Sequence, residues 1–401
     1  MSRQARPIGA LVLVLAATLT LGVAAEPAWA DDYPTWAEVQ AAKHNEAAKK
    51  AQIAKIEALV DGLETEAALA AKAALEANEA YNVALDSLEA AKKDAANLQR
   101  RADRAQRAAD KSSAEAGTLI TQLSRSGSGD FTLQLLLADK DSADDLLYKM
   151  GAMSKLSEQA AHVYEQAVLD ANLAASLSKK SGAARDARAK LADEAEAALE
   201  EAKQASAEAE VRAQNQAAVA AELYAQLASL KGTTAATEQA YLEGVAWEAA
   251  QAAVTNPPPP PPPVNPTPPA PNTDAVGGAI AFAQAQVGDP YQLNGSGPNA
   301  WDCSGLTKAS YASVGVFIGT HSATNQYSTM AAAGRLVPFN DLLPGDLLFY
   351  SNGGAAGGSK YHVTLYIGNG LMIEAPYPGV NVRVAAIRYG DLVPYAGRPT
   401  P

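Results

Sequence analysis

The sequence predicts two bodies of different fold class, a long all-α coiled-coil hairpin and a smaller α+β domain, joined by a proline-rich linker. Three observations support this division. Residues 31–254 are rich in alanine, glutamate, lysine and glutamine, which favour helices. Residues 255–273 are dominated by proline, and residues 274–401 carry glycine, tyrosine, valine and leucine in short runs between turns. The last region has the size of one compact domain.

The first thirty residues resemble a secretory signal peptide. Arg3 and Arg6 precede an apolar run at residues 8–25, and a small-residue cleavage site follows at residues 28–30. The alternative is an N-terminal membrane anchor, for which the run is near the short limit of about 20 residues. We expect removal of the signal and a secreted protein, extracellular or cell-wall associated, with no stable membrane span.

The apolar positions of the alanine-rich region repeat in alternating steps of three and four residues. Such a repeat forms one stripe along a helix and is typical of a coiled coil. Because much of the stripe is alanine, each contact buries little apolar area, and the pair needs length to be stable. The stripe comprises Ile53, Ile56, Val60, Leu63, Ala67, Ala70, Ala74, Ala77, Tyr81, Ala84, Leu88, Ala91, Ala95, Leu98 and Ala102.

The stripe is interrupted near residues 124–147, where glycines and serines surround a short apolar run. The simplest arrangement is an antiparallel hairpin of two long helices with its tip near residues 126–142. A parallel homodimer of one continuous rod is the alternative, which a mass measurement in solution distinguishes. The second stripe begins with Met153, Leu156, Ala160, Val163 and Ala167.

The proline tract predicts a spacer between the two bodies. Proline has no backbone donor and a fixed φ, so residues 255–273 cannot join a helix or a sheet. A polyproline II segment rises ~3.1 Å per residue, which gives roughly 50 Å in all.

Charge and histidine placement bear on the classes of ligand. The net charge of −12 argues against a nucleic-acid partner, whose binding surface would be basic. His44 and His162 lie in the predicted coiled coil, away from any cluster of ligand residues. We therefore expect no metal site, and the sequence implies no organic cofactor.

Cys303 is the only cysteine of the chain. Secreted chains that depend on disulfides carry even numbers of cysteines, and an odd one indicates a reactive thiol or an intermolecular bond. A turn-rich stretch precedes Cys303, and Leu306 and Tyr311 follow it at helical spacing, so the thiol lies at a helix start. The free amides and the helix dipole favour the thiolate there, which is the nucleophilic form.

His362 begins a predicted β-hairpin that offers the thiol a base. Alternating apolar residues lead to a Gly-Asn-Gly turn and a returning strand. With a three-residue loop, Ile367 pairs with Leu371, and Glu374 shares the face of His362 on a diagonal within reach. A two-residue loop would place Glu374 on the opposite face. A His362–Glu374 pair therefore requires an odd-length loop or a compensating bulge.

Four segments of the C-terminal domain carry a family resemblance. They are DPYQLNGSGPNAWDCSGLTKASY, THSATNQY, LLPGDLLFY and HVTLYIGNGLMIEAP. The domain resembles the NlpC-type peptidases, papain-like cysteine hydrolases that cut bacterial peptidoglycan, over essentially all of residues 277–398. The resemblance implies a papain-like α+β fold with helices packed on an antiparallel sheet. It also implies that Cys303 is the nucleophile, His362 the base and Glu374 the polar third residue.

The same resemblance implies a substrate site. The family's usual substrate is the stem peptide of peptidoglycan, cut between D-glutamate and meso-diaminopimelate. Tyr291 matches a tyrosine that lines the site, and Asp302 and Ser304 flank the nucleophile where the family binds the free amine of the stem peptide. Asp302 has a second interpretation as a helix N-cap. His321 stands where the family often has arginine, and residues 292–294 depart from the family pattern, so the pocket shape is not carried over.

These observations predict a secreted cysteine endopeptidase that hydrolyses peptidoglycan stem peptides in cell-wall remodelling or daughter-cell separation. One alternative is an inert coiled-coil wall-binding or scaffold protein, and another is an amidase or transferase with the same Cys-His-Glu site. The N-terminal region resembles the coiled coils of secreted, division-associated cell-wall hydrolases. Two functions stay open for it: docking on a cell-envelope protein partner, or covering the active site until it is moved.

Overall fold

The computed structural model describes residues 34–127, 143–254 and 273–400. The predicted signal peptide, all but the first two residues of the predicted hairpin tip and all but the last residue of the predicted linker lie outside these described residues.

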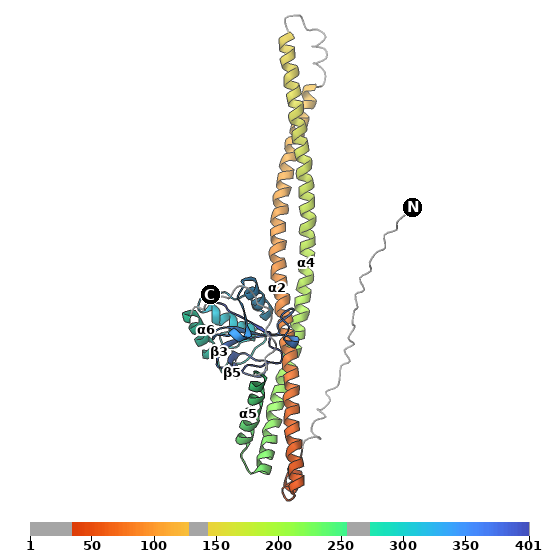
Figure 1. Ribbon diagram of the computed structural model, residues 1–401. Helices are drawn as coiled ribbons and strands as arrows, with labels where there is room; N and C mark the ends of the chain where they lie inside the picture. The colour runs from red at the N-terminus through yellow and green to blue at the C-terminus, as the bar shows by residue number, and fades with distance from the viewer. Residues whose placement is uncertain (1–33, 128–142, 255–272, 401) are drawn as a thin grey trace, which may run out of the picture.

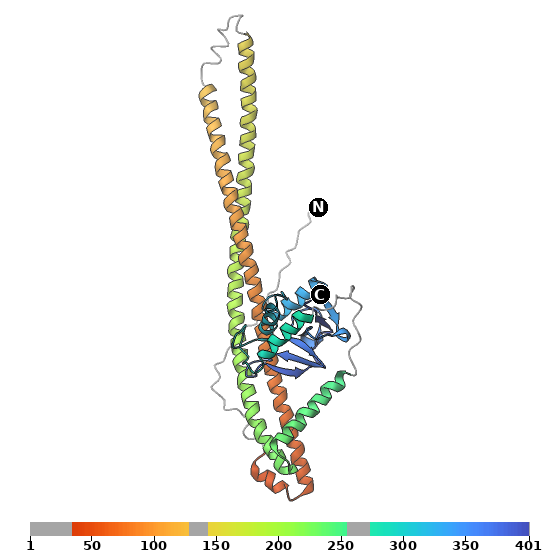
Figure 2. The ribbon, with the colours of Figure 1, turned by 90° about the vertical axis from the view of Figure 1, so that its left-hand side faces the viewer.

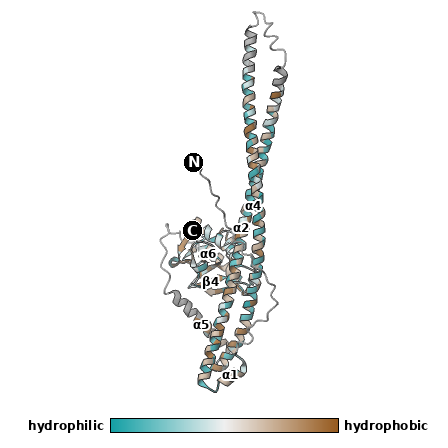
Figure 3. Ribbon diagram, turned by 90° about the vertical axis from the view of Figure 1, so that its right-hand side faces the viewer, coloured by the Kyte–Doolittle hydropathy of each residue, from teal (hydrophilic) through white to brown (hydrophobic). Residues whose placement is uncertain are grey.

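Two long helices run antiparallel and form a rod (Figures 1 and 2), as the sequence predicts. They are α2 (Glu46–Gly127) and α4 (Ala143–Lys231). Each predicted stripe position on α2, from Ile53 to Ala102, is buried or half-buried. Hydrophilic and hydrophobic residues alternate along both helices (Figure 3). Within the described ranges, no helix is both long enough and apolar enough to cross a membrane.

Two further helices close the base of the rod. α1 (Trp36–Ala42) begins with a capping box between Thr35 and Glu38, and α5 (Ala235–Val254) turns back toward the C-terminal domain (Figure 2). Lys231 at the end of α4 bridges Glu57 and Glu238 at 2.9 Å each. The apolar core at this end comprises Val39, Ala42, Ile56, Val60, Ala220, Leu223, Tyr224, Leu227 and Leu230.

The C-terminal domain is α+β, and helices pack on an antiparallel sheet as predicted. The sheet order is β1-β6-β2-β3-β4-β5. The helices are α6 (Thr273–Ala285), α7 (Cys303–Ala312) and α8 (Ala323–Ala332), with single 3₁₀ turns η2 (Phe339–Asp341) and η3 (Asn352–Gly354). The strands are β1 (Leu336–Pro338), β2 (Leu347–Tyr350), β3 (His362–Gly368), β4 (Leu371–Glu374), β5 (Arg383–Ala386) and β6 (Tyr395–Gly397).

The domain core lies between the helices and one face of the sheet. Leu306 and Tyr311 of α7 pack there with Phe349 and Val363 of the central strands. Since alternate strand residues point to opposite faces, the other residues of β2 enter a second apolar cluster on the far face. One member of the main core, Leu75, comes from α2 of the rod. The rod and the domain therefore share a buried contact.

The β3–β4 hairpin reaches the predicted face relation through a bulge. Both residues of its two-residue turn have positive φ, which an Asn-Gly pair adopts readily. Gly368 rather than Ile367 pairs with Leu371, so the predicted end pairing is wrong. The register shift at Ile367 compensates, and beyond it the pairing follows the predicted register. Glu374 and His362 consequently lie on one face.

Candidate active site

Cys303 is the first residue of α7, where the sequence places it, and is 2% exposed. Asp302 is the N-cap, and its Oδ1 accepts a hydrogen bond from the backbone N–H of Gly305 at 2.7 Å. A Cβ on Gly305 would lie 2.0 Å from the carbonyl oxygen of Gly295. The preceding turn therefore packs directly on the first turn of α7 and fixes the cysteine against the sheet.

His362 and Glu374 form the predicted pair at the adjoining ends of β3 and β4. The His362 Nε2 and the Glu374 Oε2 are 3.0 Å apart, and both side chains are fully buried. The other ring nitrogen, Nδ1, is buried and has no hydrogen-bond partner among the described residues. Val363, next to this histidine, belongs to the same buried cluster as Cys303. The imidazole thus keeps one nitrogen available beside the helix that carries the thiol.

Two arginines hold the carboxylate of Glu374, and sequence reasoning missed both. Arg388 donates two hydrogen bonds to it, at 2.8 and 2.7 Å, and the Arg383 Nε donates a third at 3.1 Å. Burial would raise the pKa of Glu374, but the charge of Arg388 and the hydrogen bonds from His362 and Arg388 hold it well below its usual value. Burial lowers the pKa of His362, against the opposing effect of Glu374. Arg383 is the cross-strand partner of Glu374, so a correct β4–β5 pairing would have found it.

The depressed pKa of Glu374 makes a prediction about stability. The ionised carboxylate contributes its full stabilisation of the fold at pH values above its ordinary pKa of 4.5. This stabilisation is lost as the pH falls through the folded-state pKa. We expect the wild type to exceed Glu374→Gln in free energy of unfolding at neutral pH, and the difference to shrink in acid. Denaturant unfolding of both proteins across this range measures it. A difference independent of pH contradicts the ion-pair assignment.

Of the four substrate residues expected from the sequence, Ser304 and His321 contact the carboxylate of Asp302 directly, and Tyr291 is linked to it through Asn78 of α2. The Asp302 Oδ1 also accepts from the Ser304 Oγ at 3.2 Å and lies 2.8 Å from the His321 Nε2. Asn78 of α2 approaches the other oxygen, Oδ2, at 3.2 Å and the Tyr291 hydroxyl at 3.5 Å. The N-cap interpretation of Asp302 is confirmed, since Oδ1 caps α7. Its other oxygen, Oδ2, accepts a hydrogen bond from Asn78 of the rod, and substrate binding by Asp302 stays a prediction.

Helix α2 lies across this site (Figure 1), and the sequence did not reveal which residues make the contact. The Glu79 carboxylate accepts from the Ser322 Oγ at 2.6 Å and from the backbone N–H groups of Ala323 and Thr324 at 2.9 Å, at the start of α8. Leu75, 5% exposed, packs in the cluster that contains Cys303. Further contacts pair Asp86 with Thr320 and Lys72 with Asp391.

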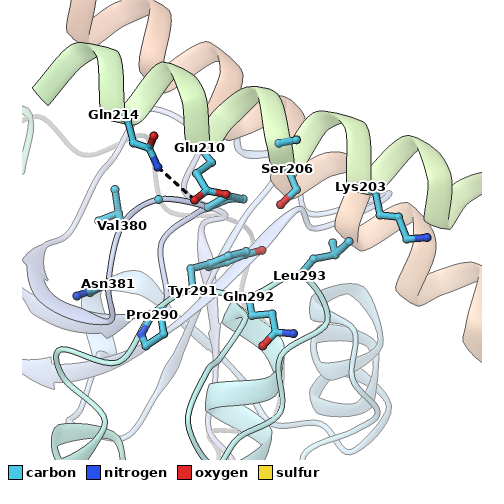
Figure 4. A pocket seen from close by; sticks show the side chains of 13 residues that line it. Lys203, Ser206, Glu210, Gln214, Pro290, Tyr291, Gln292, Leu293, Val380 and Asn381 are labelled. Atoms are coloured by element: carbon cyan, nitrogen blue, oxygen red, sulfur yellow. Dashed lines mark hydrogen bonds between the residues drawn. The ribbon is translucent and has the colours of Figure 1, made fainter. Parts of the chain in front are cut away.

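Helix α4 covers the adjoining flank. A cavity of about 490 Å³ separates its residues Lys203, Ser206, Glu210 and Gln214 from the loop that carries Tyr291 (Figure 4). Beside this cavity, Gly379 has a φ of +87°, and a Cβ there would lie 3.1 Å from the Ala213 Cβ. The two helices of the rod therefore both pack on the domain.

The surroundings of Cys303 raise the pKa of its thiol. Burial raises the pKa of Cys303 well above its ordinary value, and the charges of Asp302 and Glu79 raise it further, against hydrogen bonds from the backbone of Val363 and Ser304. In the structure as described, burial and these charges therefore oppose the thiolate that the helix start favours. Among the described residues, no group of three His, Cys, Asp or Glu side chains is placed to hold a metal.

A helix-borne cysteine packed on an antiparallel sheet that presents a His-Glu pair defines a papain-like α+β domain. Residues 288–393 match the model of the NlpC/P60 family, and the chain belongs to this family. It is 34% identical to the peptidoglycan endopeptidase RipB of Mycobacterium tuberculosis over 190 residues, which cover 43% of this chain and 75% of RipB.

A longer relative and a solved structure show the same domain-level similarity. The chain is 36% identical to the peptidoglycan endopeptidase RipA of M. tuberculosis over 132 residues, 30% of this chain, and spans only 26% of RipA. The solved structure of the peptidoglycan hydrolase RipB of M. tuberculosis is 34% identical and covers 32% of this chain and 66% of its own, with a TM-score of 0.28.

Proposed function

We propose that the protein is a secreted or wall-associated cysteine endopeptidase that hydrolyses peptidoglycan stem peptides. The observation that carries the proposal is the buried His362–Glu374 pair beside a cysteine at a helix start, in a chain of the NlpC/P60 family. The relatives named above as peptidoglycan endopeptidases support the substrate class. An inert scaffold would need none of the three residues.

In the proposed reaction, His362 takes the proton of the Cys303 thiol, and the sulfur attacks the carbonyl carbon of the scissile amide. The backbone N–H of Cys303 helps to hold the oxyanion. The imidazolium gives its proton to the leaving amine as the C–N bond breaks, which leaves a thioester on Cys303. Water, deprotonated by His362, then releases the acid and restores the thiol. Glu374 fixes the ring so that Nδ1 is the nitrogen that moves protons.

The contacts of the residues that α2 inserts support the proposed choice of bond. The Asn78 amide occupies the acceptors on Asp302 and Tyr291, which suit the free amine of a stem peptide. The Glu79 carboxylate occupies the donors at residues 322–324, which suit a substrate carboxylate. A γ-linked D-glutamate keeps its α-carboxylate free near the scissile carbonyl. The bond between D-glutamate and meso-diaminopimelate places both groups correctly.

The coiled coil acts, in this proposal, as the enzyme's own inhibitor. Of the two functions left open by the sequence, the contacts of Leu75, Asn78 and Glu79 support covering of the active site. Hydrolysis then requires that α2 move away from the active site. Displacement by a cell-envelope protein partner stays a prediction from the sequence.

The test is digestion of L-Ala-γ-D-Glu-meso-diaminopimelate by the full chain and by the full chain with Leu75→Glu, termed here the uncovered chain. We expect L-Ala-γ-D-Glu and free diaminopimelate as the products, identified by mass. Acetylation of the alanine amine, or amidation of the glutamate α-carboxylate, should each lower kcat/KM about tenfold or more, since each removes a charged partner.

Cleavage at the Ala–Glu bond instead, or transfer of the acyl group to another amine in place of water, would support the amidase or transferase alternative. Absence of any cleavage by both chains would support the scaffold alternative and refute the proposal.

A further inference from the structure

Lys72 of α2 lies in an ammonium-binding position on the C-terminal domain. Its Nζ is 2.7 Å from the Asp391 Oδ2 and 5.3 Å from the centre of the Tyr361 ring. The Tyr361 hydroxyl donates to the same Oδ2 at 2.8 Å, and the backbone N–H of Gly353 donates to Oδ1 at 3.1 Å. Burial would raise the pKa of Asp391, but the hydrogen bonds from Lys72 and Tyr361 lower it, so the carboxylate is ionised. A carboxylate beside an aromatic face is a suitable site for an organic cation.

Along α2, Lys72 lies on the opposite side of Leu75 from Asn78 and Glu79. Leu75 itself packs in the cluster with Cys303. Asn78 and Glu79 occupy the acyl side of the scissile bond in the proposed reaction. Lys72 therefore occupies the leaving side, which receives the residue whose amine departs.

The leaving side also offers free guanidinium donors. A cavity of about 430 Å³ opens between α2 and the domain, with Tyr361, Arg383, Arg388 and Asp391 in its wall. The Arg383 side chain is 42% exposed, and only its Nε bonds to Glu374. Its two terminal nitrogens make no hydrogen bond to the described residues. Planar N–H donors of this kind bind carboxylates.

We propose that Asp391 and Tyr361 form a leaving-side subsite for the side-chain ammonium of a diamino acid, and that Arg383 binds the carboxylate at the same end. The inference rests on the proposed peptidase function. Lys72 then stands in for the substrate ammonium in the covered protein, as Glu79 does for the glutamate carboxylate.

The spacing of Lys72 and Glu79 along the backbone of α2 is of the same order as the length of the substrate. Lys72 and Glu79 are seven residues apart, which at 1.5 Å per residue separates their Cα atoms by about 10 Å. In an extended γ-glutamyl-diaminopimelate, about nine bonds join the two carbons that carry the carboxylate and the ammonium, a span of about 11 Å.

The test uses the uncovered full chain and three tripeptides, L-Ala-γ-D-Glu-X, with X as meso-diaminopimelate, L-lysine or L-norleucine. Asp391→Asn should lower kcat/KM about tenfold or more for diaminopimelate and lysine, and leave norleucine, which has no ammonium, within about twofold. Arg383→Gln should lower the ratio of kcat/KM for the diaminopimelate tripeptide to kcat/KM for the lysine tripeptide, because only diaminopimelate has the extra carboxylate. The control is Asp341→Asn, an exposed carboxylate in η2.

An Asp391→Asn variant that loses activity equally on all three tripeptides would show a structural contribution only and would overturn the subsite. The subsite would also be overturned if Asp391→Asn left the ratio of kcat/KM for the diaminopimelate and norleucine tripeptides unchanged. Failure of the unsubstituted uncovered chain to cut any of the tripeptides would instead refute the proposed function, so the two failures are distinguishable.

Discussion

Replacing Leu75 with glutamate is expected to raise the hydrolysis of stem peptides by the full chain at least tenfold. Leu75 is 5% exposed and packs in the core cluster of the C-terminal domain that also contains Cys303. Loss of the leucine contacts and partial desolvation of the new carboxylate cost about 3 kcal/mol, which shifts the ratio of covered to uncovered protein by a factor of ~100. On the uncovered helix the same side chain is solvated. Initial rates on the tripeptide measure the effect.

The matched control is Leu69→Glu, the same substitution six residues earlier on α2, where the leucine is 64% exposed. Since Leu69 does not contact the domain core, this variant should keep the wild-type rate. Circular dichroism of both variants checks that the rod stays helical. Equal rates for Leu75→Glu and Leu69→Glu would argue against inhibition by α2.

Replacing Cys303 with alanine in the uncovered chain is expected to abolish hydrolysis, with a loss in kcat of roughly a thousandfold or more. Removal of the nucleophile leaves only binding and oxyanion stabilisation, which by themselves accelerate the reaction little. The Cys303→Ser variant should also be severely impaired, because a hydroxyl is much less acidic than a thiol. Product formation followed by mass spectrometry measures both losses.

Folding of the alanine variant needs a separate check, because Cys303 is buried. Loss of one sulfur from the core should cost about 1–2 kcal/mol, so the variant should unfold at a slightly lower temperature but remain folded in the assay. Wild-type rates from the alanine variant would eliminate Cys303 as the nucleophile.

The parts of the molecule that repeat or pair locally could be predicted from the sequence. The apolar stripe of α2 follows a fixed step, and a helix obeys that step over its whole length. The His362–Glu374 pair followed from strand alternation across a short turn. The detail that failed was local: the turn has two residues rather than three, and a bulge at Ile367 restores the face relation. Turn length and a bulge can compensate each other, so alternation alone does not separate them.

The contact between the rod and the domain could not be predicted from the sequence, because it depends on tertiary packing between distant segments. Asn78 and Glu79 lie beside the apolar stripe of α2 and look like ordinary polar positions of a coiled coil. Only the start of α8, more than two hundred residues further along the chain, explains the burial of Glu79. The same long-range packing brings the charge of Glu79 toward Cys303, which together with burial raises the pKa of the thiol against the effect of the helix dipole.

The enclosed thiol has a consequence if the protein is exported, as the sequence predicts. Oxidants and electrophiles react with the thiolate and need access to the sulfur. Cys303 has no second cysteine with which to form a protective disulfide. Helix α2 protects the sulfur in another way, because it opposes ionisation of the thiol and blocks access to the sulfur. Under the proposed inhibition, the movement of α2 that admits substrate would also expose the thiol to oxidants.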